Sequence, residues 1–174
     1  MNIEKIDEIT KLKKSNDYFK FTEGKNKIRI VSDMIHITEH FKNDPNNKPN
    51  DKWACFIVHY EDKKETLKLA RFPYTITHQI DMLFKDPEWT WEGTIMPFTV
   101  TVNAKDAGTR EVVYTSTPSP KLTDLSEEMT TQLAEKNIHE TTQKLKEYRD
   151  KAMQEFSTPQ GLPPVKADEI NFSV

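Results

Sequence analysis

The sequence predicts a mainly β fold with a helical C-terminal part. Several short segments alternate charged and apolar residues, which is the period of a strand with one buried face. Turn-forming residues separate these segments, and one stretch between them changes to the spacing of a helix. A longer stretch of helical spacing follows the last alternating segment. The 174 residues suffice for one domain with an appendage.

The first strand is predicted at Lys27–Val31, where charged and apolar residues alternate. Its isoleucines are expected to face the core, and Lys27 and Arg29 to face solvent. Residues 33–41 are expected to continue in an extended conformation. The next segment, residues 43–51, is rich in Asn and Pro, which predicts a loop.

A hairpin and a helix are predicted next. Residues 53–60 form an aromatic and β-branched run, a charged turn follows, and residues 66–71 alternate again. Pro73 suits a first helical turn, and Asp86 with the proline after it ends the helix. Between them the apolar side chains have helical spacing: Tyr74, Ile76, Ile80, Leu83 and Phe84.

A second hairpin completes the β part. Residues 98–102 alternate strictly, Gly108 lies in the turn, and residues 111–117 form the returning strand. The predicted order is therefore strand, strand, strand, helix, strand, strand. This is the order of the OB-fold, a five-stranded Greek-key barrel with a helix between strands 3 and 4. We assign it to residues 18–120.

Other segments flank this barrel. Residues 1–17 predict an N-terminal arm or a short helix. Residues 121–157 predict a helical appendage, in which Asp124 can cap the first helix with Glu127 three residues later. Residues 158–174 are rich in proline and poor in apolar residues, which predicts a disordered acidic tail.

Two apolar stripes lie on the predicted C-terminal helices. Their members recur at helical spacing: Leu125, Met129 and Leu133, then Leu145, Tyr148, Ala152 and Phe156. Asn137 marks a break between them. The stripes either pack back on the barrel or pair with a second copy of the chain to give a homodimer.

Composition and charge limit the functions that the chain can have. The formal charge is −3, and the excess lies after residue 120, where there are 7 basic and 10 acidic residues. Because no general basic surface is present, a nucleic-acid site has to be local. The single cysteine, Cys55, supplies neither an internal disulfide nor a Cys-rich zinc site. With no membrane-spanning run and no signal-peptide pattern, we expect a cytoplasmic protein without membrane contact.

Catalytic motifs are weak in this sequence. Residues 36–40 spell H-x-x-E-H, a zinc-peptidase motif that works only on a helix, whereas this segment is predicted to be extended. The four glycines allow neither a G-x-S-x-G elbow nor a Gly-rich phosphate loop. We therefore predict no enzyme, no bound metal and no cofactor.

Cations and aromatic rings on the predicted sheet favour nucleic-acid binding. An OB barrel binds single strands with a positive groove and with aromatic faces on which bases stack. The predicted cations are Lys27, Arg29, Lys68, Arg71, Lys105 and Arg110, and the predicted rings are Phe41, Trp53 and Tyr114. Each of them also suits a solvated strand face or a packed core. Trp89 and Trp91 are expected at the barrel mouth, one packed and one partly exposed.

Four segments together resemble the OB-fold single-stranded-DNA-binding proteins of bacteriophages and related mobile elements: Phe21–Asp33, Trp53–Cys55, Phe98–Thr109 and Tyr114–Pro120. The similarity spans residues 18–125. It implies a non-catalytic, largely sequence-independent cover for DNA during replication, recombination and repair, in a bacterial or phage-infected cell. The chain lacks the Cys-rich ligand set of the zinc-containing helix-destabilising proteins of some large phages, so only the general class is implied.

The end of the chain shows a second resemblance. Asp168, Glu169, Ile170 and Phe172 are similar to the acidic tip by which bacterial single-strand-binding proteins recruit replication partners. The resemblance implies a tail that binds replication or recombination proteins. Asn171 replaces the usual proline and two residues follow Phe172, so a contact through the terminal carboxylate is not implied. A plain disordered end is the alternative.

Two other functions stay open on the sequence alone. The same barrel can serve as a protein-interaction module, because a fold does not fix a function. It can also bind RNA, whose bases stack on the same kind of surface.

Overall fold

The structure is a computed structural model that describes residues 18–39 and 50–156. The side chains of Glu39, Tyr148 and residues 152–156 are not described. The predicted N-terminal arm, the predicted tail and Phe41 lie outside these ranges. So do the four tail residues with a predicted partner-binding role: Asp168, Glu169, Ile170 and Phe172.

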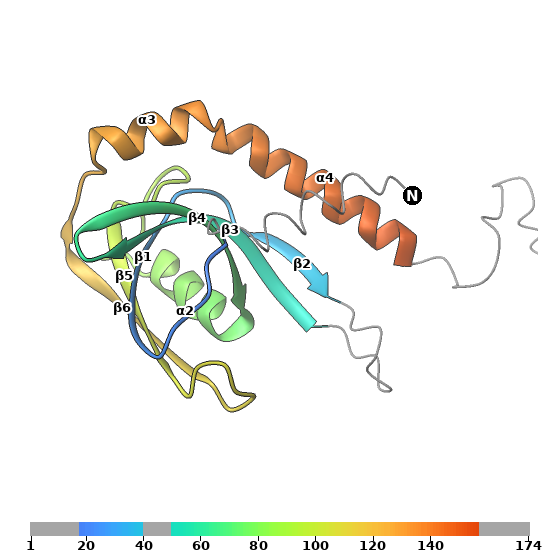
Figure 1. The fold of residues 1–174 in the computed structure, drawn as a ribbon, viewed down its shortest axis with the longest axis horizontal. Helices are drawn as coiled ribbons and strands as arrows, with labels where there is room; N and C mark the ends of the chain where they lie inside the picture. The colour runs from blue at the N-terminus through green and yellow to red at the C-terminus, as the bar shows by residue number, and fades with distance from the viewer. Residues whose placement is uncertain (1–17, 40–49, 157–174) are drawn as a thin grey trace, which may run out of the picture.

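Six antiparallel strands form one curved sheet (Figure 1). They are β1 (Gly24–Ile30), β2 (Ile35–Glu39), β3 (Asn50–Glu61), β4 (Lys64–Pro73), β5 (Phe98–Lys105) and β6 (Val113–Leu122). The hydrogen-bonded order is β2-β3-β1-β5-β6, and β4 also pairs with β3. The predicted mainly β class is confirmed.

The structure has six strands where the sequence predicts five, because the first predicted strand is interrupted. Both β1 and β2 pair with β3, and the register shifts by two residues between the pairs Ile30–Ile57 and Ile35–Ala54. Ser32 lies in the interruption, and its hydroxyl accepts the backbone N–H of Phe56 at 2.8 Å. The side chain thus replaces a ladder bond that the strand cannot make there.

The edges of β4 and β6 are not paired with each other, so the sheet is not closed as the predicted barrel would be. Other segments bind these two edges instead. At β4, Phe19 donates its backbone N–H to the Leu69 carbonyl at 2.8 Å. At β6, Gln79 donates Nε2 to the Tyr114 carbonyl at 3.0 Å and accepts the N–H of Ser116 at 2.6 Å. We call the space between the two edges the seam.

Helix α2 (Tyr74–Lys85) follows β4 directly, as predicted. Pro73 is its N-cap and Asp86 its C-cap. Ile76 and Ile80 face the sheet and are buried. They belong to the main core, with Phe19, Ile28, Ile30, Cys55, Ile57, Ala70, Phe72, Met96, Phe98, Val100 and Val102. The prediction that the isoleucines of the first strand face inward is confirmed.

Strand β3 is apolar on both faces. Cys55 and Ile57 point into the main core, whereas Phe56, Val58 and Tyr60 belong to the opposite, outer face. A second core covers the outer face, formed by Val31, Val58, Leu67, Met129 and Ile138. Helix α3 (Glu127–Glu135) and the start of α4 (Ile138–Phe156) supply its wall, on the other side of the sheet from α2 (Figure 1). The C-terminal helices therefore pack back on the sheet.

Two side chains fix the ends of these helices. The predicted cap at Asp124 is wrong: the N-cap is Ser126, two residues later, and its hydroxyl accepts the N–H of Met129 at 3.1 Å. Asn137, at a φ of 43°, separates α3 from α4 as predicted. Its Oδ1 accepts the N–H of Glu140 at 3.4 Å, which caps α4.

Replacing Gln79 by Leu is expected to lower the free energy of unfolding by about 1–3 kcal/mol. The variant leaves a carbonyl and an N–H of the β6 edge without the partners that Gln79 supplies. Urea unfolding followed by circular dichroism measures the change. The matched control is Gln143→Leu on the exposed face of α4. Equal stability of the two variants would contradict the role given to Gln79.

The Cys55 thiol is expected to be unreactive in the folded protein. It is buried, and burial raises its pKa far above the ordinary value, so almost no thiolate is present at neutral or mildly alkaline pH. An aromatic disulfide reagent should label one thiol per chain in urea and none without it. Rapid labelling of the native protein would place Cys55 outside the core.

Candidate nucleic-acid interface

Four aromatic side chains from three elements form a continuous row, which we call the aromatic strip. They are His36 of β2, Trp53 of β3, and Tyr74 and His78 of α2. The ring centroids are 5.0 Å apart for His36 and Trp53, and 6.0 Å apart for Trp53 and Tyr74. The rings of Tyr74 and His78 are stacked, with centroids 5.5 Å apart and 9° between their planes. These separations are those of interacting rings, so the four side chains form one surface.

Register and helical spacing position these rings. His36 and Trp53 are directly opposite in the β2–β3 ladder, and Asp51 holds His36 by a contact of 2.8 Å to Nε2. Tyr74 and His78 lie one turn apart on the same face of α2. The Tyr74 side chain is 61% exposed, and His78 is exposed as well. A planar ligand can therefore reach the strip.

A second group of rings lies in the seam. Phe21 contacts Tyr114, with 5.2 Å between centroids, and Phe72, with 5.7 Å. Phe72 is fully buried and is opposite Trp53 in the β3–β4 ladder, so this group adjoins the aromatic strip. Tyr114 is half-buried, and burial raises the pKa of its hydroxyl. The predicted stacking residue Tyr114 therefore lies among packed rings.

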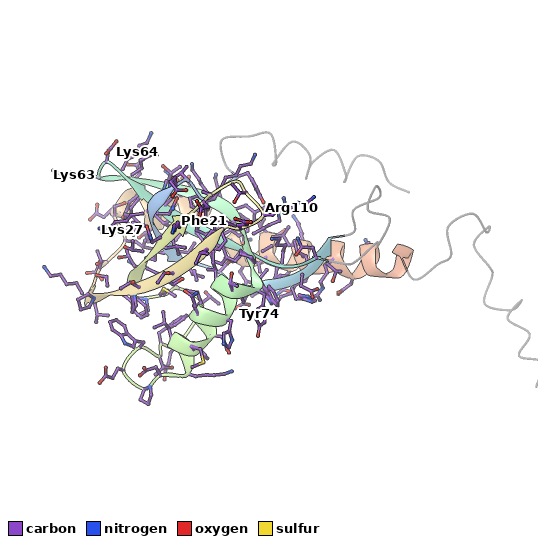
Figure 2. All side chains as sticks on the ribbon, turned by 90° about the horizontal axis from the view of Figure 1, so that it is seen from below. Phe21, Lys27, Lys63, Lys64, Tyr74 and Arg110 are labelled. Carbon is purple, nitrogen blue, oxygen red and sulfur yellow. The ribbon has the colours of Figure 1, made fainter. Side chains whose placement is uncertain are left out.

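The predicted cations differ in their surroundings. Arg71 lies 5.1 Å from the ring centroid of Tyr18 and donates Nε to its hydroxyl. Lys105 and Arg110 are exposed at the β5–β6 hairpin, where solvent surrounds them. Figure 2 shows Lys27 near the β3–β4 turn, at a distance from α2.

Arg29 is not on the surface, so its predicted contact with nucleic acid is wrong for this structure. Its side chain is 5% exposed. It donates Nε to the Met96 carbonyl at 2.6 Å and Nη1 to the Thr123 carbonyl. The residue does belong to the outer face of β1, as the alternation predicts, but the second core and the chain leading into α3 cover that face. Arg29 instead ties β1 to the segments before and after the last hairpin.

Lys27 and Lys68, both predicted for one groove, lie on opposite faces of the sheet. Lys27 is opposite Tyr60, and its Nζ lies 5.5 Å from the centroid of that ring, on the outer face. Lys68 is opposite Ile57, which points into the main core. Lys68 and Arg71 also lie on opposite faces of the sheet, because they are three positions apart on one strand. A single groove lined by all the predicted strand cations is therefore excluded.

Trp89 and Trp91 are both half-buried, so the predicted difference between them is not observed. Their rings pack edge-on against Phe98, with centroid distances of 5.3 Å and 5.8 Å. They pack against the main core at the connector before β5.

The sequence patterns do not predict every residue of the site. The helical spacing assigns Tyr74 and Phe84 to the buried side of α2, but they are 61% and 46% exposed. The available signal is the spacing of four between Tyr74, His78 and Met82, which marks a second face of the helix. His36 enters the sequence argument only through the zinc motif. The extended conformation predicted for its segment is confirmed by β2.

The chain has no match among known protein families, among curated proteins or among solved structures. In the described part of the chain, no helix combines the length and the apolar character needed to cross a bilayer.

The stability of the protein is expected to fall as the pH decreases through 6.5, in part because of His59. Burial lowers the pKa of His59 from 6.5, nearby Lys68 lowers it further, and Glu61 acts in the opposite direction. Below 6.5 the unfolded chain therefore binds a proton at this site more readily than the folded chain, which favours unfolding. Above 6.5 both states are neutral there and the effect vanishes.

Urea midpoints at about pH 7.5 and pH 5 measure this contribution. The midpoint of His59→Gln should change less between the two conditions than that of the unaltered protein. The exposed His139→Gln serves as the control and should behave like the unaltered protein. The same pH dependence in all three proteins would contradict the assignment.

Proposed function

We propose that this chain binds single-stranded DNA without sequence preference. The aromatic strip carries the proposal, because its contiguous rings, with Tyr74 61% exposed, offer faces on which any base can stack. Each base stacked on an aromatic side chain stabilises such a complex by about 1–3 kcal/mol. Stacking uses the π-face that all bases share, so it does not select a sequence.

Cations near the rings contribute the electrostatic part of binding. Arg71 precedes Phe72, which is paired with Trp53 across the β3–β4 ladder. Lys105 and Arg110 are exposed on the hairpin that leads into Tyr114. Because the chain has a formal charge of −3, attraction to phosphates depends on such local groups. The strand is proposed to run from the aromatic strip along the seam toward this hairpin.

The order of the elements supports an OB-type scaffold for this activity. When β1 and β2 are counted as one interrupted strand, the chain runs strand, strand, strand, helix, strand, strand. OB-folds bind oligonucleotides on strands 2 and 3 and on the adjoining loops. The corresponding strands here are β3 and β4, and α3 covers part of their outer face. We therefore propose binding at the end of these strands, where α2 begins.

In the cell, such a protein would cover and protect single strands during replication, recombination or repair. The resemblance to phage proteins favours a phage-infected or bacterial cytoplasm as its place of action. The acidic tail would recruit replication or recombination proteins, and no catalytic step is required of the chain.

Anisotropy titrations of a labelled oligo-dT test the proposal most directly. We expect binding of oligo-dT in preference to duplex DNA, with a log–log salt slope of about −0.7 for each phosphate neutralised. Binding that ignores salt, or equal affinity for duplex DNA, would overturn the proposed mechanism. A preference for a matched RNA oligomer would favour the RNA-binding alternative, and no binding at all the protein-interaction module.

Removing a stacking ring is expected to weaken oligo-dT binding. Trp53→Ala and Tyr74→Ala should each cost about 1–3 kcal/mol of binding free energy if a base stacks on that ring. Met82→Ala is the matched control, since Met82 is exposed on the same face of α2 but carries no ring. Melting temperatures establish that each variant is folded. Unchanged affinity in both ring variants would remove the aromatic strip from the site.

Tyr114→Ala is expected to behave differently from the variants of the strip. Its ring packs against Phe21 in the seam, so its loss should lower the melting temperature together with any effect on binding. Weaker oligo-dT binding at an unchanged melting temperature would instead make Tyr114 a stacking residue.

A further inference from the structure

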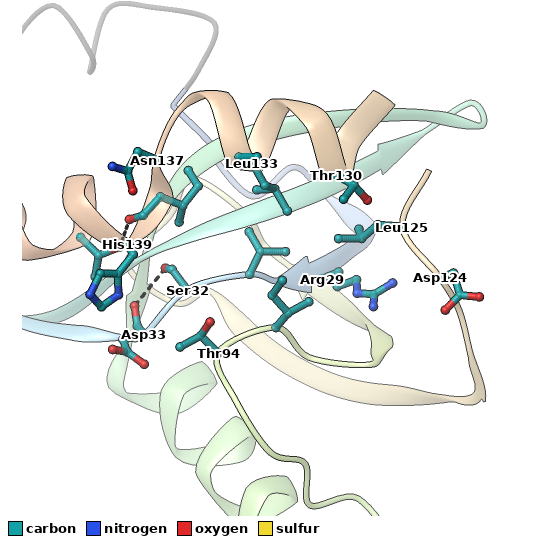
Figure 3. Close-up of a pocket in the computed structure, with 15 residues that line it drawn as sticks. Arg29, Ser32, Asp33, Thr94, Asp124, Leu125, Thr130, Leu133, Asn137 and His139 are labelled. Carbon is teal, nitrogen blue, oxygen red and sulfur yellow. Dashed lines mark hydrogen bonds between the residues drawn. The ribbon is translucent and has the colours of Figure 1, made fainter. Parts of the chain in front are cut away.

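A pocket of about 540 Å³ lies between the C-terminal helices and the sheet, on the side opposite α2 (Figure 3). Several of its lining side chains are apolar, among them Val31, Leu125, Leu133 and Ile138. The volume lies in the range of small-molecule sites, roughly 300–1,000 Å³. The second core is thus incompletely filled where α3 meets α4, and a ligand of moderate size can enter.

Arg29 gives this pocket a buried positive charge. The side chain lines the pocket and is 5% exposed. Its described hydrogen bonds use Nε and Nη1, both to backbone carbonyls, and so occupy two of the five N–H groups of a guanidinium. Among the described residues, no carboxylate oxygen lies within 4.0 Å of it. A buried charge without an opposite charge is costly, which favours an anionic partner.

The Tyr60 hydroxyl lies beside Arg29 on the outer face of the sheet. The Tyr60 hydroxyl is buried and has no hydrogen-bond partner in the described part of the chain. Burial raises the pKa of Tyr60, Arg29 lowers it through its nearby N–H donors and its charge, and the Glu65 carboxylate raises it. Tyr60 thus lies between Arg29 and the Glu65 carboxylate, and among the described residues Arg29 itself has no carboxylate within 4.0 Å.

We propose that this pocket binds a small organic acid, with its anionic group at Arg29 and its apolar body against the second core. Planar oxyanions match the guanidinium fork, and a single acid group neutralises the buried charge. The apolar walls then bury the rest of the molecule.

Two carboxylates help to define the orientation of this ligand. Figure 3 shows Asp124 at the same end of the pocket as Arg29, and Asp33 with His139 at the other end. Asp124 is exposed, so solvent strongly screens its repulsion of an anion. The attraction between the anion and buried Arg29 is screened far less. Asp33 is engaged with Lys146 at 3.6 Å. The anionic group is therefore placed at Arg29, and the apolar body points toward α4.

A pair of fluorescent dyes tests the proposal on the full chain without any DNA. The first, 8-anilinonaphthalene-1-sulfonate, combines aromatic rings with one anionic group, and the second, N-phenyl-1-naphthylamine, has the same rings without the charge. We expect one sulfonate dye to bind per chain, at least tenfold more tightly than the uncharged dye. Equal affinity for the two dyes, or no fluorescence enhancement with the sulfonate, would overturn the proposal.

Variants on α3 identify the site of the dye. Ala134→Phe places a ring at the pocket wall and should weaken sulfonate binding at least tenfold. Thr131→Phe, exposed on the same helix outside the pocket, should leave it unchanged. Undiminished dye binding to Ala134→Phe would overturn the proposal. Displacement of the dye by oligo-dT would also overturn it, because the dye would then bind at the aromatic strip. In Arg29→Gln, provided that it folds, the two dyes should bind equally.

Discussion

The apolar character of both faces of β3 is the constraint on which the rest of the architecture depends. Residues 54–58 contain no charged or amide side chain, so neither face can be left in water. The main core with α2 covers one face, and the second core with α3 and the start of α4 covers the other. Burying Met129 alone contributes about 1.5–3 kcal/mol. The C-terminal helices are therefore an integral layer of the domain, because they cover the outer face of the sheet.

This layering also decides where a ligand can approach. With both faces of the central strand covered, the accessible parts of the sheet are its ends and its unpaired edges. The rings that remain open lie there, with Tyr74 and His78 on α2 beside Trp53 at one end of β3. Arg29, on the covered outer face, is 5% exposed and lines the pocket beneath the helices. The open rings at the end of the sheet and the pocket beneath the helices are therefore two separate surfaces.

The strands, the first helix and the break at Asn137 could be predicted because each depends on local pattern. The outward position of Arg29 was also predictable from alternation, but its burial depends on α3, which is distant in sequence. The signal available in the sequence was the continuous apolar run at residues 54–58, which indicates that both faces of this strand are covered. The predicted closure into a barrel is not observed, because the Gln79 side chain and not β4 binds the β6 edge, and such a side-chain contact has no sequence signature.

The two bonds of Gln79 have a mechanical consequence. One amide side chain offers a donor and an acceptor in the way a neighbouring peptide would, so α2 is fastened to β6 as if it were another strand. The helix cannot roll about its axis unless it releases β6 or carries it along. Helix α2, which carries Tyr74 at its start, and β6 are therefore coupled through Gln79, so a displacement of one must shift the other or break these bonds.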